Sequence, residues 1–329
     1  MQTSHKLTHW LLTLFALVMA ASVSLAADPG IPYPLTSEAS DQKAGSVLFY
    51  NFYTSSVTKK GQDTDISITN TNRSEIAEVH IFFVDGSTCS LAAVIGVCLT
   101  PGQTARFLAS SVDPGETGYV VAVAGKDNGY PRSFNYLIGS EYVKFASDQV
   151  ASLNAEAFAA LYTGYLPESD VHFGMATLKF DGIVYNRAPR VLAFDNIRSV
   201  VDGNSALLIV NRVGGALQGG TTLGTLFGLL FDEAENLHSF QFSPSGCQLR
   251  GELSDSFPRT APNFSTVIPS GHTGWMELWA TADVGILGAV INFNKKANNG
   301  PTAFSGGRNL HKLTLTTDSL TIPLSQSSC

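Results

Sequence analysis

Residues 113–124 read DPGETGYVVAVA, and residues 272–280 read HTGWMELWA. In both stretches a Thr-Gly pair precedes an apolar run, with Gly118 and Gly274 in matching places. A phosphate-binding loop would lead from its glycines into the N-terminus of a helix. Here the glycines lead into runs rich in valine and aromatic residues, which favour strands. Each stretch is therefore predicted to be a tight turn followed by a core strand.

Other segments of the two halves also match, in the same order. Cys98 in the first half corresponds in order to Cys247 in the second. The remaining matches are residues 47–55 (VLFYNFYTS) with 191–199 (VLAFDNIRS), 65–72 (DISITNTN) with 207–212 (LLIVNR), and 79–85 (VHIFFVD) with 226–232 (LFGLLFD). Five matches in one order predict two copies of one domain, not a solenoid of short repeats.

The composition predicts an all-β fold. Only 14% of the residues are charged, and runs such as HIFFVD are apolar on both faces, as in the central strands of a packed sandwich. We expect two tandem immunoglobulin-like antiparallel β-sandwich domains, at residues 46–146 and 188–329. A jelly roll is the competing all-β architecture.

Residues 147–187 are predicted to connect the two domains through a short helix and a hairpin. The stretch NAEAFAALYTG places Asn154 as a helix N-cap and Gly164 near the helix C-terminus. Further on, Asp181 and Gly182 lie between two apolar runs, which is typical of a two-residue hairpin turn.

The N-terminus is typical of a cleaved secretory signal. Residues 1–6 are mildly basic, and the apolar run that follows ends in small residues, so cleavage is expected after Ala26. This leaves residues 27–45 as an N-terminal extension. No later stretch is long and apolar enough to be a transmembrane segment. We expect an exported protein, extracellular, at the cell surface or in the periplasm.

The four cysteines of the mature chain suggest disulfides. Four cysteines allow three pairings. The sequence favours Cys89–Cys98, because CSLAAVIGVC is short enough to be a loop closed at its base, and then Cys247–Cys329. The alternative is a free Cys329 that cross-links chains.

The order SITNTN, VHIFFVDGSTC, LTPGQTARF, GYVVAVA within residues 46–146 resembles that of exported bacterial immunoglobulin-like repeat proteins. The resemblance extends to the second half only in outline. It implies a β-sandwich and an extracytoplasmic location, and it transfers no catalytic residue.

No catalytic, cofactor-binding or metal-binding residue is predicted. His80 lies within a predicted strand and is interpreted as a packed residue, and His272 as a solvated turn residue. Asp85 and Asp232 end strands, where carboxylates commonly accept backbone hydrogen bonds in turns. The net charge of −7 is spread along the chain without a basic patch, so no nucleic-acid partner is expected.

The stretch WMELW is the most suggestive functional feature. Strand geometry places Trp275, Glu277 and Trp279 on one face and Met276 and Leu278 on the other. If the first set faces solvent, two indoles with a carboxylate between them form a ligand platform for sugar rings. The sequence favours the alternative, burial in the core, because Val121 and Val123 stand at the matching places in the first half.

Two functions follow as hypotheses. The first is a non-catalytic secreted or cell-surface structural or adhesive protein, which binds a surface glycan or protein or associates with itself. The second is a secreted carbohydrate-binding or hydrolytic protein that uses the second domain. The missing active-site signature favours the first.

Overall fold

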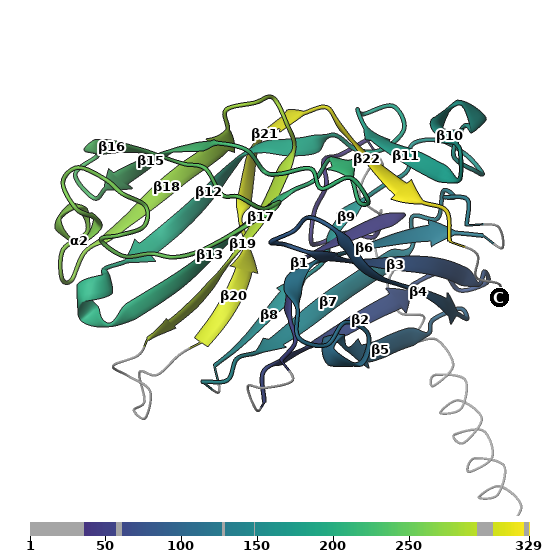
Figure 1. Ribbon diagram of the computed structural model, residues 1–329, viewed down its shortest axis with the longest axis horizontal. Helices are drawn as coiled ribbons and strands as arrows, with labels where there is room; N and C mark the ends of the chain where they lie inside the picture. The colour runs from purple at the N-terminus through teal and green to yellow at the C-terminus, as the bar shows by residue number, and fades with distance from the viewer. Residues whose placement is uncertain (1–35, 57–60, 127–128, 148, 295–304, 326–328) are drawn as a thin grey trace, which may run out of the picture. The chain divides into compact units, whose positions relative to one another are not determined.

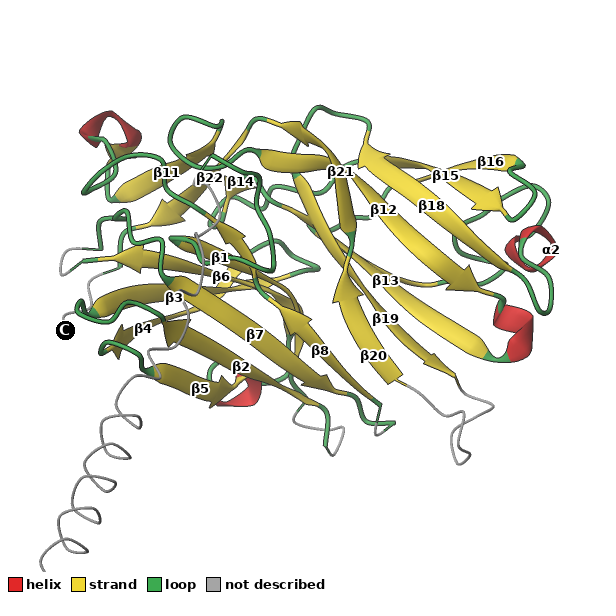
Figure 2. Ribbon diagram, turned by 180° about the vertical axis from the view of Figure 1, so that it is seen from behind, coloured by secondary structure: helices red, strands yellow, loops and turns green. Residues whose placement is uncertain are grey.

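The computed structural model describes residues 36–56, 61–126, 129–147, 149–294, 305–325 and 329. The predicted signal peptide, residues 1–26, lies outside them. Residues 35–329 form one compact unit. Within the described ranges, helix is confined to the four-residue α2 (Phe264–Val267) and the 3-10 turns η1 (Ala109–Ser111), η2 (Glu168–Asp170) and η3 (Val200–Asp202) (Figure 2). The fold is all-β, as predicted.

Two facing sheets enclose the first core. Sheet A has the strand order β4-β3-β6-β1-β9, and sheet B has the order β5-β2-β7-β8. The strands of sheet A are β1 (Val47–Thr54), β3 (Ala77–Asp85), β4 (Leu91–Leu99), β6 (Thr117–Gly125) and β9 (Glu156–Phe158). Those of sheet B are β2 (Asp63–Asn70), β5 (Thr104–Leu108), β7 (Leu137–Lys144) and β8 (Val150–Asn154). Ile81 and Phe83 of sheet A pack with Ile66 of sheet B in one buried cluster.

Two further sheets enclose the second core. Sheet C has the order β16-β15-β18-β12-β21, and sheet D has the order β17-β13-β19-β20. The strands of sheet C are β12 (Ala188–Arg198), β15 (Leu226–Asp232), β16 (Leu237–Phe242), β18 (Thr273–Ala280) and β21 (His311–Thr316). Those of sheet D are β13 (Asn204–Arg212), β17 (Gln248–Glu252), β19 (Ile286–Asn294) and β20 (Ser305–Asn309). Met276 and Leu278 of sheet C pack with Leu208 and Val290 of sheet D.

A fifth sheet packs on the second face of sheet A (Figure 1). Sheet E has the order β10-β11-β22-β14, with strands β10 (Val171–His172), β11 (Met175–Phe180), β14 (Gly215–Ala216) and β22 (Asp318–Pro323). Phe180 and Ile322 of this sheet pack against Phe49 and Val121 of sheet A. Sheet A therefore has apolar neighbours on both faces, which explains why β1 is buried at every position.

The prediction of two tandem immunoglobulin-like sandwiches is wrong. The described strands form five small sheets, and sheet E collects segments from residues 171–180, 215–216 and 318–323. An immunoglobulin domain has the strand orders ABED and CFG, with its first strand at a sheet edge. Here β1 lies inside sheet A, between β6 and β9, and it is buried at every position. A five-bladed β-propeller also consists of five small sheets, one in each blade. In this chain, each of the five sheets includes strands that are distant from one another in the sequence.

The predicted connector helix and hairpin are also wrong. Residues 150–154 form β8, and residues 156–158 form β9, which pairs with β1. Burial of Phe158 in the core overrides the local helix propensity. The turn at Asp181 is present, since its carboxylate accepts the backbone N–H groups of Ile183 and Val184. However, the strand partner of β11 is β22, and the segment that follows the turn contributes to β11 a backbone hydrogen bond from the Tyr185 N–H to the Lys179 carbonyl oxygen, at 3.0 Å. The finer domain boundaries stay predictions.

The stretches that match in sequence pair in the same way. Gly118 lies opposite Asp85 of β3, and Gly274 lies opposite Asp232 of β15. A Cβ atom on Gly118 would lie 1.8 Å from the Val84 carbonyl oxygen, so the close strand approach requires glycine there. These glycines serve strand pairing and not ligand binding.

Buried amides join segments from the two halves of the sequence. Asn211 Nδ2 donates to the Asn51 carbonyl oxygen at 2.8 Å, and Gln248 Nε2 donates to the Gly118 carbonyl oxygen at 2.9 Å and to Asn211 Oδ1 at 2.9 Å. The two halves of the sequence therefore share one interior and are not separate domains joined by a linker.

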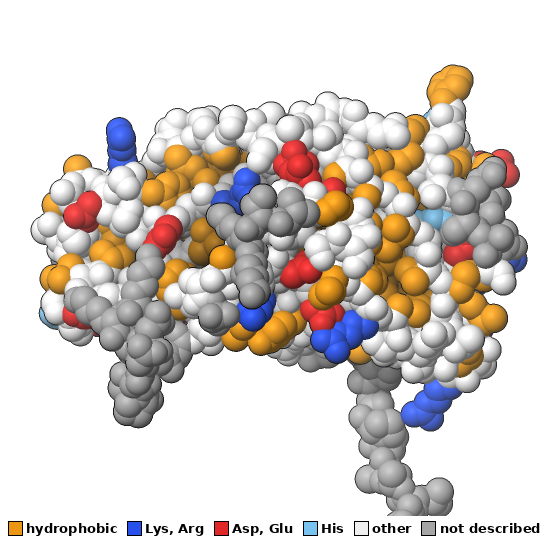
Figure 3. Space-filling model, turned by 60° about the horizontal axis from the view of Figure 1, so that its bottom comes forward, with side chains coloured by type: hydrophobic (Ala, Val, Ile, Leu, Met, Phe, Trp, Pro, Cys, Tyr) orange, Lys and Arg blue, Asp and Glu red, His pale blue; other side chains and the backbone are white. Residues whose placement is uncertain are grey.

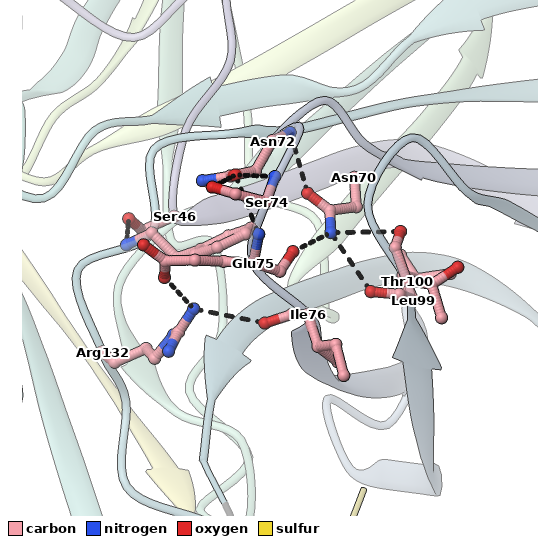
Figure 4. Close-up of polar contacts among 10 residues, drawn as sticks. Ser46, Asn70, Asn72, Ser74, Glu75, Ile76, Leu99, Thr100 and Arg132 are labelled. Carbon is pink, nitrogen blue, oxygen red and sulfur yellow. Dashed lines mark hydrogen bonds and ion pairs between the residues drawn. The ribbon is translucent and has the colours of Figure 1, made fainter.

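The strand-ending Asn70 fixes a loop at the end of β2 (Figure 4). Its Nδ2 donates to the carbonyl oxygens of Glu75 at 2.8 Å and Leu99 at 3.1 Å, and its Oδ1 accepts the backbone N–H of Asn72. This role differs from that of Asn211, although the two residues match in sequence.

A disulfide is present, but both predicted pairings are wrong. Cys98 pairs with Cys329, while Cys89 and Cys247 are free and buried. Cys89 precedes β4 and Cys98 lies near its end, so an extended strand separates them by roughly 30 Å at about 3.3 Å per residue. The sequence stretch between them is a strand of a hairpin and not a loop that returns to its base.

Candidate functional site

The outer face of sheet C carries the residues predicted as a ligand platform. Along β18, Met276 and Leu278 are buried in the core between sheets C and D. The alternate residues Trp275, Glu277 and Trp279 point away from that core, and Trp275 is 38% exposed. The prediction that these side chains are buried in the core, which the sequence favoured, is therefore wrong. Glutamate at position 277 is tolerated because it is half-buried and lines an open groove, so it is not enclosed in the core.

Cross-strand pairs extend this surface onto β15. Phe231 stacks on Trp275 with ring centroids 4.3 Å apart and an interplanar angle of 4°, and Phe227 lies 5.2 Å from Trp279. The register places Phe231 opposite Trp275 and Phe227 opposite Trp279. We call Phe227, Phe231, Trp275, Glu277 and Trp279 the aromatic face. Trp275 and Trp279 are four residues apart on one strand, or roughly 13 Å.

An open groove borders the aromatic face on the side of β12 and β21. Its volume is about 380 Å³, and it is lined by Arg190, Val191, Glu277, Trp279, Leu313 and Thr314. The Arg190 guanidinium forms an ion pair with Asp283, with Nε 3.2 Å from Oδ1. The residues directly opposite Glu277 on the neighbouring strands, Leu229 and Ala193, are uncharged. The groove thus offers a ligand apolar area and the carboxylate of Glu277, while the charge of Arg190 is partly neutralised by Asp283.

The corresponding face of sheet A is covered. Tyr119, Val121 and Val123 of β6 point into the cluster shared with sheet E. In contrast, none of the four buried clusters of the described residues contains Trp275 or Trp279. The difference between the two sheets explains why valines in β6 are replaced by Glu277 and Trp279 in β18.

The remaining candidates have structural roles. Asp85 accepts the Ser87 backbone N–H and the Thr88 hydroxyl, and Asp232 accepts two backbone N–H groups and the Asn236 amide, as expected of turn carboxylates. His80 is buried in β3, and burial lowers its pKa.

His272 lies at the surface, where its Nδ1 is 2.8 Å from Glu233 Oε2. The hydrogen bonds from Thr273 and His272 hold the pKa of Glu233 below its usual value. This pair fixes the turn before Trp275, so it positions one end of the aromatic face.

A second cavity, of about 310 Å³, lies where β12 ends and where β13 and β20 begin. Its residues include Asn204, Ser205, Asn292 and Arg308. The Arg308 guanidinium already forms an ion pair with Asp195, with Nη2 2.7 Å from Oδ1. Its charge is therefore partly neutralised before any ligand enters.

Sequence reasoning missed Phe227 and Phe231. Their signal is the alternation in LFGLLFD, where Leu226 and Leu230 are buried and the two phenylalanines point the other way. The groove residues Arg190 and Thr314 carry no such signal, because β21 joins β12 from more than one hundred residues away.

Figure 3 shows charged side chains scattered singly over one side of the molecule, with apolar ones between them. Among the described residues, no group of three or more His, Cys, Asp or Glu side chains is placed to hold a metal ion. In the same residues, no helix has the length and apolarity needed to span a membrane.

No protein-family model matches the chain, and no curated protein sequence matches it. A faint likeness is found to a solved structure entitled "The structure of a beta-glucuronidase from glycoside hydrolase family 2", with 9% sequence identity and a TM-score of 0.15. The alignment covers 84% of this chain and 25% of that chain, so the present chain spans about a quarter of its length. A TM-score of this size shows no common fold, and the likeness gives no support to glycoside hydrolysis.

Proposed function

We propose that this chain is an exported, non-catalytic structural or adhesive protein that contacts its partner through the aromatic face. The observation that carries the proposal is the contrast between sheets A and C. Sheet A is covered on both faces by the protein's own strands, whereas the outer face of sheet C leaves Trp275 partly exposed. Aromatic side chains that project from a rigid sheet supply large contact area at low entropic cost.

The surroundings of the aromatic face support contact with a partner at this surface. Leu313 and Leu315 of β21 are 49% and 41% exposed, so the apolar area continues onto the edge strand. Contiguous exposed apolar area on a soluble protein marks an interaction site. The strand-end carboxylates are occupied by turn hydrogen bonds, which favours binding without catalysis.

A glycan is the second candidate, favoured by Glu277. This carboxylate lies between two indoles and beside the groove, where it can accept hydrogen bonds from sugar hydroxyls while the rings stack on the indoles. A protein partner would need an apolar contact instead, and a cation to pair with Glu277.

The test compares the double variant W275A/W279A with Y142A. Tyr142 is 47% exposed on sheet B, so it is a matched aromatic surface control. Wild type and variants are assayed on a glycan array, on whole cells and by analytical ultracentrifugation. We expect wild type to bind cells, the double variant to remain folded and to lose binding at least tenfold, and Y142A to bind as wild type.

Glycan-array binding that the double variant loses would assign the face to sugars. Self-association that it loses would assign the face to a second copy. Unchanged cell binding by the double variant, or no binding of any kind by wild type, would refute the proposal.

A further inference from the structure

Two buried cysteines meet in the interior from distant parts of the sequence. Cys89 lies in the turn between β3 and β4, and Cys247 lies directly before β17. They are 4% and 1% exposed, and both belong to the cluster between sheets A and E. In the structure both thiols are free.

The backbone around the two residues is in close contact. Cys247 Sγ lies 3.6 Å from the Asp85 carbonyl oxygen, and the Cys89 backbone N–H donates to that same oxygen at 2.9 Å. On either side of Cys247, the Gln248 N–H donates to the Gly86 carbonyl oxygen at 3.1 Å, and a Cβ atom on Gly246 would lie 2.2 Å from it. The start of β17 is thus fixed against the turn that contains Cys89.

The Cys247 Sγ also lies 3.7 Å from the Gly86 carbonyl oxygen, so its thiol faces the turn that carries Cys89. Burial raises the pKa of both thiols, so each is neutral and protonated at physiological pH. A neutral buried thiol is neither a good nucleophile nor a metal ligand, which argues against a catalytic or metal-binding role for the pair.

We propose that Cys89 and Cys247 form a second disulfide in the exported protein. The inference goes beyond the proposed binding function and rests on the proposed export, because disulfides persist in oxidising compartments. It also accounts for all four cysteines, since Cys98 pairs with Cys329. The pairing Cys89–Cys247 is the one that this bridge leaves.

The reaction needs a thiol oxidant that carries a disulfide. An Sγ–Sγ bond forms between Cys89 and Cys247, their two thiol protons and two electrons pass to the oxidant, and its disulfide is reduced to two thiols. Because both sulfurs are buried in the folded chain, the exchange takes place before the turn and β17 have closed over them.

The second bridge has a structural consequence for β4, which is the edge strand of sheet A. Cys98 near its end is tied to Cys329, and Cys89 before its start would be tied to Cys247. An edge strand with unpaired backbone groups is a site of unwanted strand pairing. With the second bridge in place, a covalent link would restrain β4 near each of its ends.

The experiment counts thiols in the full chain, exported through its own leader and purified without reductant. The protein is denatured in N-ethylmaleimide, and the labels are counted by intact mass. We expect no label on wild type, one on C89S, and none on C89S/C247S. A non-reduced digest should yield a linked peptide pair containing residues 89 and 247.

Two labels on wild type, located at Cys89 and Cys247, would overturn the second bridge alone and leave the Cys98–Cys329 bridge standing. Four labels would overturn both the bridge and the export. A linked pair that joins Cys89 to Cys98 would also overturn the proposal.

Discussion

The substitution G118A tests whether close pairing of β6 with β3 requires glycine in the repeated Thr-Gly turn. A Cβ atom at this position would lie 1.8 Å from the Val84 carbonyl oxygen and 2.9 Å from the Gly86 nitrogen, both of which are backbone atoms. These atoms cannot move away without separating β6 from β3. Separation of the two strands would also weaken the hydrogen bond that the Gly86 N–H donates to the Thr117 carbonyl oxygen, in which the nitrogen and the oxygen are 3.2 Å apart.

The expected cost follows from these contacts. Overpacking in a well-packed core costs about 1–3 kcal/mol, and a weakened buried hydrogen bond adds about 1 kcal/mol. Replacing glycine by alanine returns about 0.5–1 kcal/mol by restricting the unfolded chain. These contributions sum to about 1–3.5 kcal/mol, and because the closest contact is only 1.8 Å from a backbone oxygen, we expect G118A to lower the free energy of unfolding by about 3 kcal/mol.

Two other glycines calibrate the measurement. At Gly274 the closest backbone contact is longer than at Gly118, because the Cβ atom would lie 2.5 Å from the Phe231 carbonyl oxygen, and the next atom, Cδ1 of Ile268 at 2.8 Å, belongs to a side chain. G274A should therefore cost about 1–2 kcal/mol. At Gly306 no atom lies within 4 Å of the Cβ position, so G306A should change stability by less than about 0.5 kcal/mol.

Urea unfolding followed by far-ultraviolet circular dichroism gives the three values, with the slope of the transition checked for constancy. The expected order of cost is G118A, then G274A, then G306A. If G118A unfolds at the same urea concentration as G306A, the close approach of β6 to β3 is not what requires glycine at position 118.

Three further predictions concern burial and charge. Burial raises the pKa of Glu156 to about 7 despite its ion pair with Lys312, so the free energy of unfolding should fall as pH rises from about 4.5 to 7. In urea titrations at several pH values, E156Q should lack this part of the pH dependence. Parallel plots of unfolding free energy against pH for wild type and E156Q would contradict the prediction. N211A should cost about 2 kcal/mol in urea unfolding, because it leaves the Asn51 carbonyl without that donor in the interior; a cost below about 0.5 kcal/mol would contradict the buried amide network. W275A should cost about 1 kcal/mol, the value of a surface aromatic pair, and a thermal-unfolding cost of about 3–5 kcal/mol would instead indicate a core residue.

The sequence predicted strands well where burial is simple. The run VLFYNFYT became β1, which is buried at every position, and the run GYVVAVA became the buried part of β6, because runs that are mostly apolar at consecutive positions need cover on both faces. The alternation of WMELW correctly divided β18 into two faces. It did not show which face is open, since that depends on whether another sheet packs there.

The candidate site was predicted in part. Trp275, Glu277 and Trp279 were identified together, and their shared face follows from strand geometry alone. Phe231 lies beside Trp275 because β15 pairs with β18 in that register. Arg190 of β12 lines the neighbouring groove together with Glu277 and Trp279. Such neighbours are set by strand order, which local sequence does not encode.

The sequence by itself determined the local conformation of this chain: apolar runs dictated strands, and Asp and Gly residues dictated turns. It failed where distant segments compete for the same place. Residues 156–158 form a strand that pairs with β1 and do not form the predicted helix. Cys98 forms a disulfide with Cys329 across a sequence separation of 231 residues. Only the tertiary structure decided that sheet E covers sheet A and leaves the aromatic face of sheet C open, because burial is a property of packed layers and not of single strands.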